Sequence, residues 1–177
     1  METYVALLHS IVLSPGKRVV MVDLKAMAEG LGFRNARTLA ATGNLVFEGE
    51  TAPLGEIEAR LEAGFRTSFG KHVDIIARTA EGWKRLAAAN PFPQGNGADV
   101  VVRAMRVPLD GKALARLESH ATPGIRLALS HGDLWIDFAA KPSETKLLAH
   151  LTTKKLGIGT LRNANTVNGL AAMPGRS

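Results

Sequence analysis

The chain has 177 residues, of which 46% are hydrophobic and 21% charged, a composition that suits a globular protein of one domain or two closely packed subdomains. It contains no cysteine, which excludes disulfides, thiolate metal sites and a cysteine nucleophile. The formal charge is +6, and the stretch from Lys141 onward holds six basic residues and one acid, so this part of the chain is the one best suited to contact phosphates or acidic surfaces.

The N-terminal stretch METYVALLHSIVL lacks the features of a signal peptide. It carries an acid, Glu2, where a signal peptide has basic residues, and His9 interrupts its apolar run. No stretch approaches the roughly 18 consecutive apolar residues that span a bilayer. We therefore expect a cytoplasmic protein with no membrane contact.

The first half of the chain predicts a β-α-β-β-α-β order. Short apolar or alternating runs predict strands, and apolar residues at helical spacing predict helices. Pro15-Gly16 marks a turn, Thr42-Gly43-Asn44 a tight hairpin, and Gly70 the end of a helix that begins near Pro53. The expected elements are a strand at 3–10, a helix at 21–32, two strands within 36–50, a helix at 53–70 and a strand at 72–79.

The second half repeats this order, but a final strand is missing from the prediction. A linking helix ends at Asn90-Pro91, and a polar, glycine-rich loop follows. We then expect a strand, a helix begun near Asp110, a hairpin at His131-Gly132 and one helix from Ser143 to Gly157. Trp83 and Trp135 are expected to serve packing.

The element order predicts an α+β fold of two ferredoxin-like (βαββα-type) subdomains, the second incomplete and followed by a C-terminal helical tail. The expected division is a ferredoxin-like subdomain at 1–79, a linking helix and loop at 80–97, and the second subdomain with its tail at 98–177. The oligomeric state stays open.

Several segments, taken in order, resemble a bacterial family catalogued as domain of unknown function 1697. They span nearly the whole chain: Tyr4 to Leu8, Met21 to Phe33, Arg37-Thr38, Thr42 to Phe47, Ala89-Asn90-Pro91-Phe92, Lys146 to Leu148 and Arg162 to Val167. The resemblance implies an α+β fold with a ferredoxin-like N-terminal part, and it implies no activity.

The chain departs from the family pattern at several polar or aromatic positions. Where relatives typically have arginine, glycine and asparagine after the first strand, this chain has His9, Ser10 and Val12. Ala41 and Thr42 stand in place of glutamine and serine, and Ala164 in place of tryptophan. If those groups form a site in relatives, this chain has lost part of it.

The strongest candidate site is the stretch RNANTVNGL near the C-terminus. Arginine offers a planar fork for phosphate or carboxylate, and amides both donate and accept hydrogen bonds. The leading hypothesis is a non-catalytic binding protein for an anionic ligand, either a phosphate-bearing small molecule or nucleic acid. The predicted ligand-binding residues are Arg162, Asn163, Asn165, Thr166, Lys17, Asn44 and Lys146. Asn163 or Asn165 can instead cap a short helix.

Two other functions stay open. An enzyme of unknown reaction would use His9 as general base and Arg162 to stabilise developing negative charge in one cleft. An interaction module would present its sheet or its basic tail to another chain. No metal site and no cofactor are predicted, because the histidines show no metal-ligand spacing and no glycine-rich nucleotide motif is present.

Two further patterns point away from specific chemistries. Ser143 to Lys146 fits the S-x-x-K spacing of acyl-enzymes, but helix capping by Ser143 accounts for it more simply and the partner motifs are absent. RNA recognition on a ferredoxin-like sheet needs exposed aromatics. Tyr4 and Phe47 lie on the corresponding strands without the rest of that motif.

Overall fold

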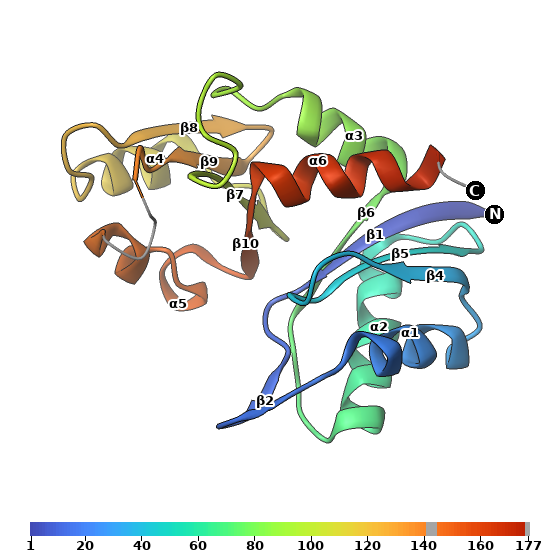
Figure 1. Cartoon of the computed structure of the whole chain (residues 1–177). Helices are drawn as coiled ribbons and strands as arrows, with labels where there is room; N and C mark the ends of the chain where they lie inside the picture. Colours follow the sequence, from blue (N-terminus) through green and yellow to red (C-terminus); the bar gives the residue numbers. More distant parts are fainter. Residues whose placement is uncertain (141–144, 176–177) are drawn as a thin grey trace. The chain divides into compact units, whose positions relative to one another are not determined.

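The computed structural model describes residues 1–140 and 145–175 and has a mixed α+β architecture (Figure 1). Within these residues there are six α-helices and three antiparallel sheets. The chain divides into two compact units, the first formed by Met1–Arg85 together with the segment from Gly169 onward, and the second by Leu86–Asn168. The α+β class predicted from the sequence is confirmed. The boundaries between the units fall inside α3 (Ala80–Ala88) and α6 (Ala164–Ala172).

The first unit holds a four-stranded sheet in the order β4-β5-β1-β6, with every neighbouring pair antiparallel. A two-stranded ribbon of β2 and β3 turns at Pro15-Gly16, as predicted. The elements in chain order are β1 (Glu2–Leu8), β2 (Val12–Ser14), β3 (Lys17–Arg18), α1 (Met21–Gly30), β4 (Arg34–Thr38), β5 (Asn44–Gly49), α2 (Leu54–Phe69), β6 (Ile75–Thr79) and α3 (Ala80–Ala88).

Helices α1 and α2 cover one face of this sheet, where alternate strand residues form the core of the unit. Tyr4 and Phe47 stack in this core with ring centroids 5.7 Å apart, and both side chains are fully buried. The Tyr4 hydroxyl also accepts a hydrogen bond from the Ala52 amide at 3.0 Å. Because helices cover this face, these two aromatics cannot stack RNA bases.

Two glutamates of α2 supply hydrogen-bond acceptors to the edge strand β6. Glu58 Oε2 accepts the Ala77 N–H at 2.9 Å, and Glu62 Oε2 accepts the Ile75 N–H at 3.2 Å. The four-residue spacing of the glutamates puts them on one helix face, and the two-residue spacing of the amides puts them on one strand edge. The two glutamates thereby supply acceptors to N–H groups of an edge strand.

Glu58→Ala is expected to cost about 1–3 kcal/mol of unfolding free energy, because it leaves the buried Ala77 amide without this acceptor. Glu58→Gln keeps an acceptor and should cost less. Urea denaturation measures both, and Glu62→Ala, at a half-buried position, serves as the milder comparison. Equal stability of Glu58→Ala and the parent protein would contradict this role.

The second unit holds another four-stranded antiparallel sheet, in the order β10-β7-β9-β8. Its core lies on one face of this sheet and includes Leu117, Leu134, Ile136 and Leu147. The elements are β7 (Val100–Met105), α4 (Gly111–Glu118), β8 (Arg126–Ser130), β9 (Asp133–Asp137), the 3-10 helix η2 (Lys146–His150), α5 (Thr153–Leu156), β10 (Gly159–Asn163), α6 (Ala164–Ala172) and the 3-10 helix η3 (Met173–Gly175).

Most local signals in this unit are confirmed. Asp110 caps α4 by accepting the Ala113 N–H at 2.9 Å. His131 and Gly132 form the turn between β8 and β9 with positive φ angles of 50° and 83°, a two-residue hairpin. Trp135 is 1% exposed, so it serves packing as expected. In the first unit Trp83 is fully buried as well.

Two expectations for this unit are wrong. The final strand exists, because β10 pairs with β7 along its whole length. The helix expected from Ser143 to Gly157 is two short helices within the described residues. Thr152 Oγ1 accepts the Lys155 N–H at 3.3 Å and so begins α5 after η2 has ended. A threonine side chain that bonds to nearby backbone favours such a break. Ser143 lies outside the described residues.

Candidate functional site

The predicted site around Arg162 is a junction between β10 and α6. Arg162 is 7% exposed, and its Nη1 donates to Thr160 Oγ1 at 2.9 Å and to the Leu161 carbonyl at 2.8 Å. Asn163 Oδ1 accepts the Thr166 N–H at 2.9 Å, which is the helix cap that the sequence suggested. The exposed Asn165 donates its backbone N–H to the Gly97 carbonyl at 3.3 Å. These contacts build the junction itself.

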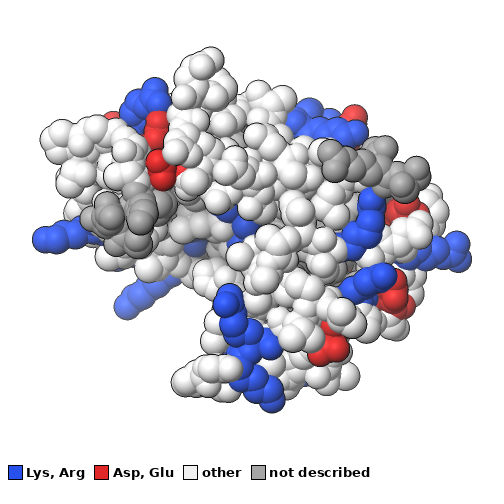
Figure 2. All heavy atoms as spheres, in the orientation of Figure 1, with Lys and Arg blue, Asp and Glu red and all other residues white. Residues whose placement is uncertain are grey.

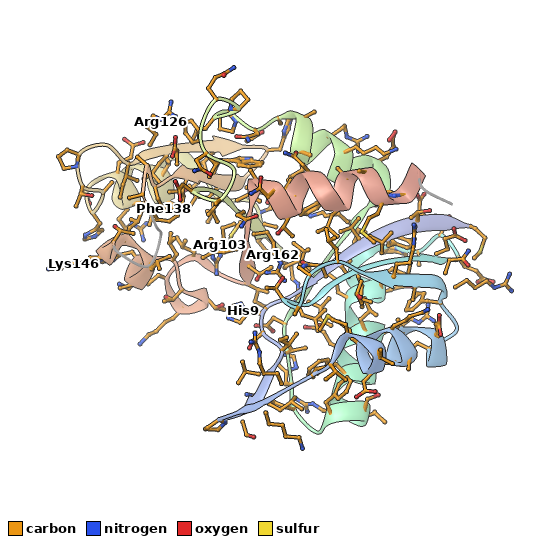
Figure 3. All side chains as sticks on the ribbon, viewed as in Figure 1. His9, Arg103, Arg126, Phe138, Lys146 and Arg162 are labelled. Atoms are coloured by element: carbon orange, nitrogen blue, oxygen red, sulfur yellow. The ribbon has the colours of Figure 1, made fainter. Side chains whose placement is uncertain are left out.

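Burial lowers the pKa of Arg162 to about 10. The guanidinium therefore stays charged at neutral pH, in surroundings that penalise its charge. A second arginine of the same unit, Arg103, is 1% exposed and donates to Met105 Sδ at 2.7 Å and to the Gly157 carbonyl at 3.1 Å. Burial lowers the pKa of Arg103 as well. Figure 3 labels both arginines.

The other predicted residues lie on separate elements, three of them in the first unit and Lys146 in the second. Asn44 is fully buried, and its Nδ2 donates to the Leu39 carbonyl and to Thr42 Oγ1, both at 2.8 Å, so its amide is engaged within its own loop. Lys17 is exposed on the β2–β3 ribbon. Lys146 is exposed at the start of η2, apart from Arg162 in Figure 3. His9 is exposed where β1 ends, and its backbone N–H donates to the Asp74 carbonyl at 2.9 Å. His9 and Arg162 belong to different units.

The structure brings together a different set of basic residues, which we call the basic pocket. It encloses about 420 Å³ within the second unit, between the end of α4, the end of η2 and α5. Three apolar residues, Ala113, Leu117 and Leu156, line it together with five basic side chains: Arg116, His120, His150, Lys154 and Lys155. Among the residues that the structure describes, the lining includes no carboxylate.

Two histidines of the basic pocket lie face to face. The imidazole rings of His120 and His150 stack with centroids 3.7 Å apart and planes 11° from parallel. Lys155 Nζ lies 3.0 Å from His150 Nδ1, a contact in which a neutral imidazole accepts. Burial, His120 and Lys155, in that order, lower the pKa of His150. This arrangement therefore favours a neutral His150 near pH 7 when the pocket holds no anion.

Sequence patterns did not identify the basic pocket, because its parts are distant in the chain. His120 follows α4 and His150 ends η2, so no motif spacing links them. The signal that was available is the basic character of the chain beyond Lys141, which includes Lys154 and Lys155. On the face shown in Figure 2, the Lys and Arg side chains lie at many separate places, so the net charge alone does not indicate one site.

Other polar clusters are accounted for by their own contacts. Glu62, His72 and Asp74 hold oxygen and nitrogen atoms within 4.8 Å of one another, a grouping that could hold a metal ion. His72 Nε2 already lies 2.8 Å from Asp74 Oδ1, and Glu62 accepts the Ile75 amide. These contacts explain the cluster without an ion.

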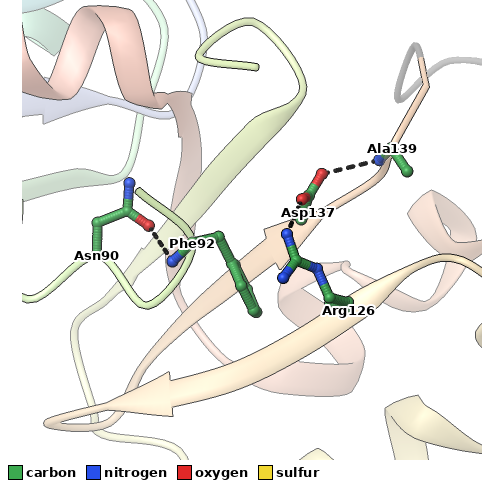
Figure 4. Close-up of polar contacts among 5 residues, drawn as sticks. All are labelled: Asn90, Phe92, Arg126, Asp137 and Ala139. Atoms are coloured by element: carbon green, nitrogen blue, oxygen red, sulfur yellow. Dashed lines mark hydrogen bonds and ion pairs between the residues drawn. The ribbon is translucent and has the colours of Figure 1, made fainter. Parts of the chain in front are cut away.

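The Asn90-Pro91-Phe92 motif that marked the family resemblance is also structural (Figure 4). Asn90 Oδ1 accepts the Phe92 N–H at 2.8 Å and so fixes the turn. The Arg126 guanidinium lies 4.7 Å from the centroid of the Phe92 ring and 2.5 Å from Asp137 Oδ2. Asp137 Oδ1 in turn accepts the Ala139 N–H at 2.9 Å. The cluster ties the segment before β7 to the β8–β9 hairpin.

The fold and these contacts define an α+β protein of two units, each with a four-stranded antiparallel sheet. A sequence model of the family described as "Protein of unknown function (DUF1697)" matches residues 1–135. The chain belongs to this family, as the sequence resemblance suggested. The matched stretch contains α4 but neither η2, α5 nor β10, so half of the basic pocket lies beyond it.

A solved structure shares the fold along nearly the whole chain. It is described as that of a conserved bacterial protein from Streptococcus pneumoniae, with a TM-score of 0.72, 19% sequence identity and 99% of each chain covered. At this identity the likeness concerns the fold alone. No curated protein matches the chain. Among the helices described, none is long and apolar enough to cross a membrane.

Proposed function

We propose that this chain is a non-catalytic binding protein for an anionic ligand, and that the basic pocket is its binding site. The observation that carries the proposal is a lining that, within residues 1–140 and 145–175, has five basic side chains and no carboxylate. The permanent cations Arg116 of α4 and Lys154 and Lys155 of α5 repel one another, and an anion between them offsets that repulsion. Arg116 adds a planar donor fork suited to phosphate or carboxylate.

The size of the pocket favours a small ligand over nucleic acid. A volume of about 420 Å³ lies in the range of small-molecule sites. Nucleic-acid binding would require a longer basic track and would weaken steeply with salt. A small anion held by a few side chains has a shallower salt dependence, which separates the two ligand classes experimentally.

The double substitution Lys154→Ala and Lys155→Ala is expected to weaken binding of inorganic phosphate at least tenfold. Each substitution removes one cation from the pocket lining. An attraction of about 1 kcal/mol between each lysine and the bound phosphate suffices for this loss of affinity. Isothermal titration calorimetry with phosphate at low ionic strength measures it. Both lysines are exposed, so the fold should be retained.

The matched control is Lys112→Ala with Lys146→Ala. It makes the same change in net charge within the same unit, at exposed positions outside the pocket lining. It also tests Lys146, which was predicted from the sequence as a ligand contact. Equal weakening by the two double variants would mean that phosphate responds to overall charge, and the assignment to the basic pocket would be wrong.

We further propose that each unit is a ferredoxin-like subdomain. The support is the strand order: in both sheets the first strand of the unit lies centrally, between the third and the fourth strands of its β-α-β-β-α-β series. In the second unit, η2 and α5 take the place of the second helix. The cytoplasmic location predicted from the sequence stays a prediction.

A further inference from the structure

We infer that the basic pocket binds the dianionic phosphate group of a small phosphomonoester and takes up protons on His120 and His150 as it does so. This inference rests on the proposed function and specifies its ligand and its pH dependence. It is carried by the stacked imidazoles, by the cations around them and by the apolar part of the lining.

In the free protein, the groups around His150 disfavour its charged form. Two imidazolium rings 3.7 Å apart would repel each other, and three permanent cations of the lining, Arg116, Lys154 and Lys155, add to that repulsion. No carboxylate in the described part of the lining offsets them. The lowered pKa of His150 agrees with this geometry.

A dianion reverses this balance. Placed among the five basic side chains, it favours the charged form of each histidine, because opposite charges attract. Protonation of His150 at Nδ1 ends the contact with Lys155 Nζ, which frees the lysine ammonium to donate to the anion. His120, just beyond the C-terminal end of α4, is also placed where the helix dipole favours a positive charge.

The rest of the pocket suits the organic part of a phosphomonoester. Ala113, Leu117 and Leu156 offer an apolar surface beside the basic groups, which free inorganic phosphate does not need. A phosphomonoester carries between one and a half and two negative charges near neutral pH, with a second pKa of about 6. A carboxylate carries one charge and so offsets less of the repulsion.

The sign of the pH dependence follows from the histidines. The complex holds more protons than the free protein between the free and the bound histidine pKa values. Affinity therefore rises as the pH falls through this window and levels off once the free protein is protonated as well. For one proton taken up, the affinity changes about tenfold per pH unit.

The test uses the full chain and two probes, inorganic sulfate and phenyl phosphate. Sulfate stays dianionic across the range, so any pH dependence of its binding comes from the protein. Calorimetry in buffers of different ionisation enthalpy counts the protons taken up, and imidazole NMR signals follow His120 and His150 directly. We expect sulfate to bind about tenfold more tightly at pH 6 than at pH 8, with proton uptake, and phenyl phosphate to bind more tightly than inorganic phosphate.

The decisive variant is His120→Gln with His150→Gln, which removes both titrations while keeping polar side chains. We expect it to bind sulfate with an affinity that does not change with pH. His131→Asn, in the β8–β9 turn and outside the pocket lining, is the control and should keep the pH dependence of the parent protein.

The outcomes separate the two proposals. Absence of sulfate and phosphate binding at every pH would overturn the proposed function itself. Binding that is independent of pH, or that keeps its pH dependence in the double glutamine variant, would overturn the proton-linked mechanism alone. Equal affinities for phenyl phosphate and inorganic phosphate would overturn the phosphomonoester assignment.

Discussion

Asn44→Asp is expected to destabilise the first unit by about 3–5 kcal/mol at pH 7. The parent amide is fully buried and donates to two acceptors, the Leu39 carbonyl and Thr42 Oγ1. An isosteric carboxylate cannot donate to either acceptor, and it places a charge in a buried site. Chemical denaturation followed by circular dichroism measures the loss.

Two comparisons separate the effect of the buried charge from the effect of the lost hydrogen-bond donors. The introduced carboxyl group should have a raised pKa in the folded protein, so its destabilisation is smallest below about pH 4 and grows as the pH rises above that value. Asn44→Ala removes the donors without adding a charge, so its cost of roughly 2 kcal/mol should not change across this range. If Asn44→Asp were as stable as the parent at pH 7, the buried amide would not be what holds this loop.

The elements that were predicted well are those whose signals are local. The helix Leu54–Phe69 follows Pro53 and ends at Gly70, whose φ of 73° places it in the left-handed region. The His131-Gly132 turn likewise depends on two adjacent residues. In both cases the residues that determine the conformation lie within the element or at its ends, so the sequence pattern is sufficient.

Strand β10 was missed because its evidence lies elsewhere in the chain. Gly159 is a poor strand residue by propensity. A Cβ at Gly159 would lie 2.5 Å from Arg103 Nη1 on the neighbouring strand β7. The glycine therefore allows a buried arginine to pack against it, and this tertiary requirement conceals the strand signal in the sequence.

The basic pocket was not predicted for a related reason. Arg162 and its neighbouring amides looked like binding chemistry because helix capping explains only part of the pattern. The structure accounts for much of the rest, since Arg162 donates to Thr160 and to the Leu161 carbonyl and is largely buried. The basic pocket instead joins His120 to His150 through the packing of α4 against the later helices, a contact that no spacing along the chain reveals.

Gly132→Ala is expected to cost about 3–5 kcal/mol of unfolding free energy. Gly132 has a φ of 83°, and a Cβ there would lie 2.6 Å from Pro108 Cα and closer still to Pro108 Cβ. Proline cannot move away as a flexible side chain does, so the backbone before α4 must shift. That shift strains the hydrogen bond from the Leu109 N–H to the Gly132 carbonyl, which is 2.9 Å long in the parent protein.

Gly124→Ala separates the clash from the backbone strain. Gly124 has a φ of 95°, but a Cβ there meets no heavy atom within 4 Å, so this variant should lose only about 1 kcal/mol. Equal losses in the two variants, measured by urea denaturation, would show that the contact with Pro108 contributes nothing.

The effect of Gly132→Ala should also reach the basic pocket. The segment that the new Cβ displaces, Pro108-Leu109, leads directly into α4, which positions Arg116 and His120. Gly132→Ala should therefore also weaken sulfate binding in the basic pocket, although Gly132 does not line it.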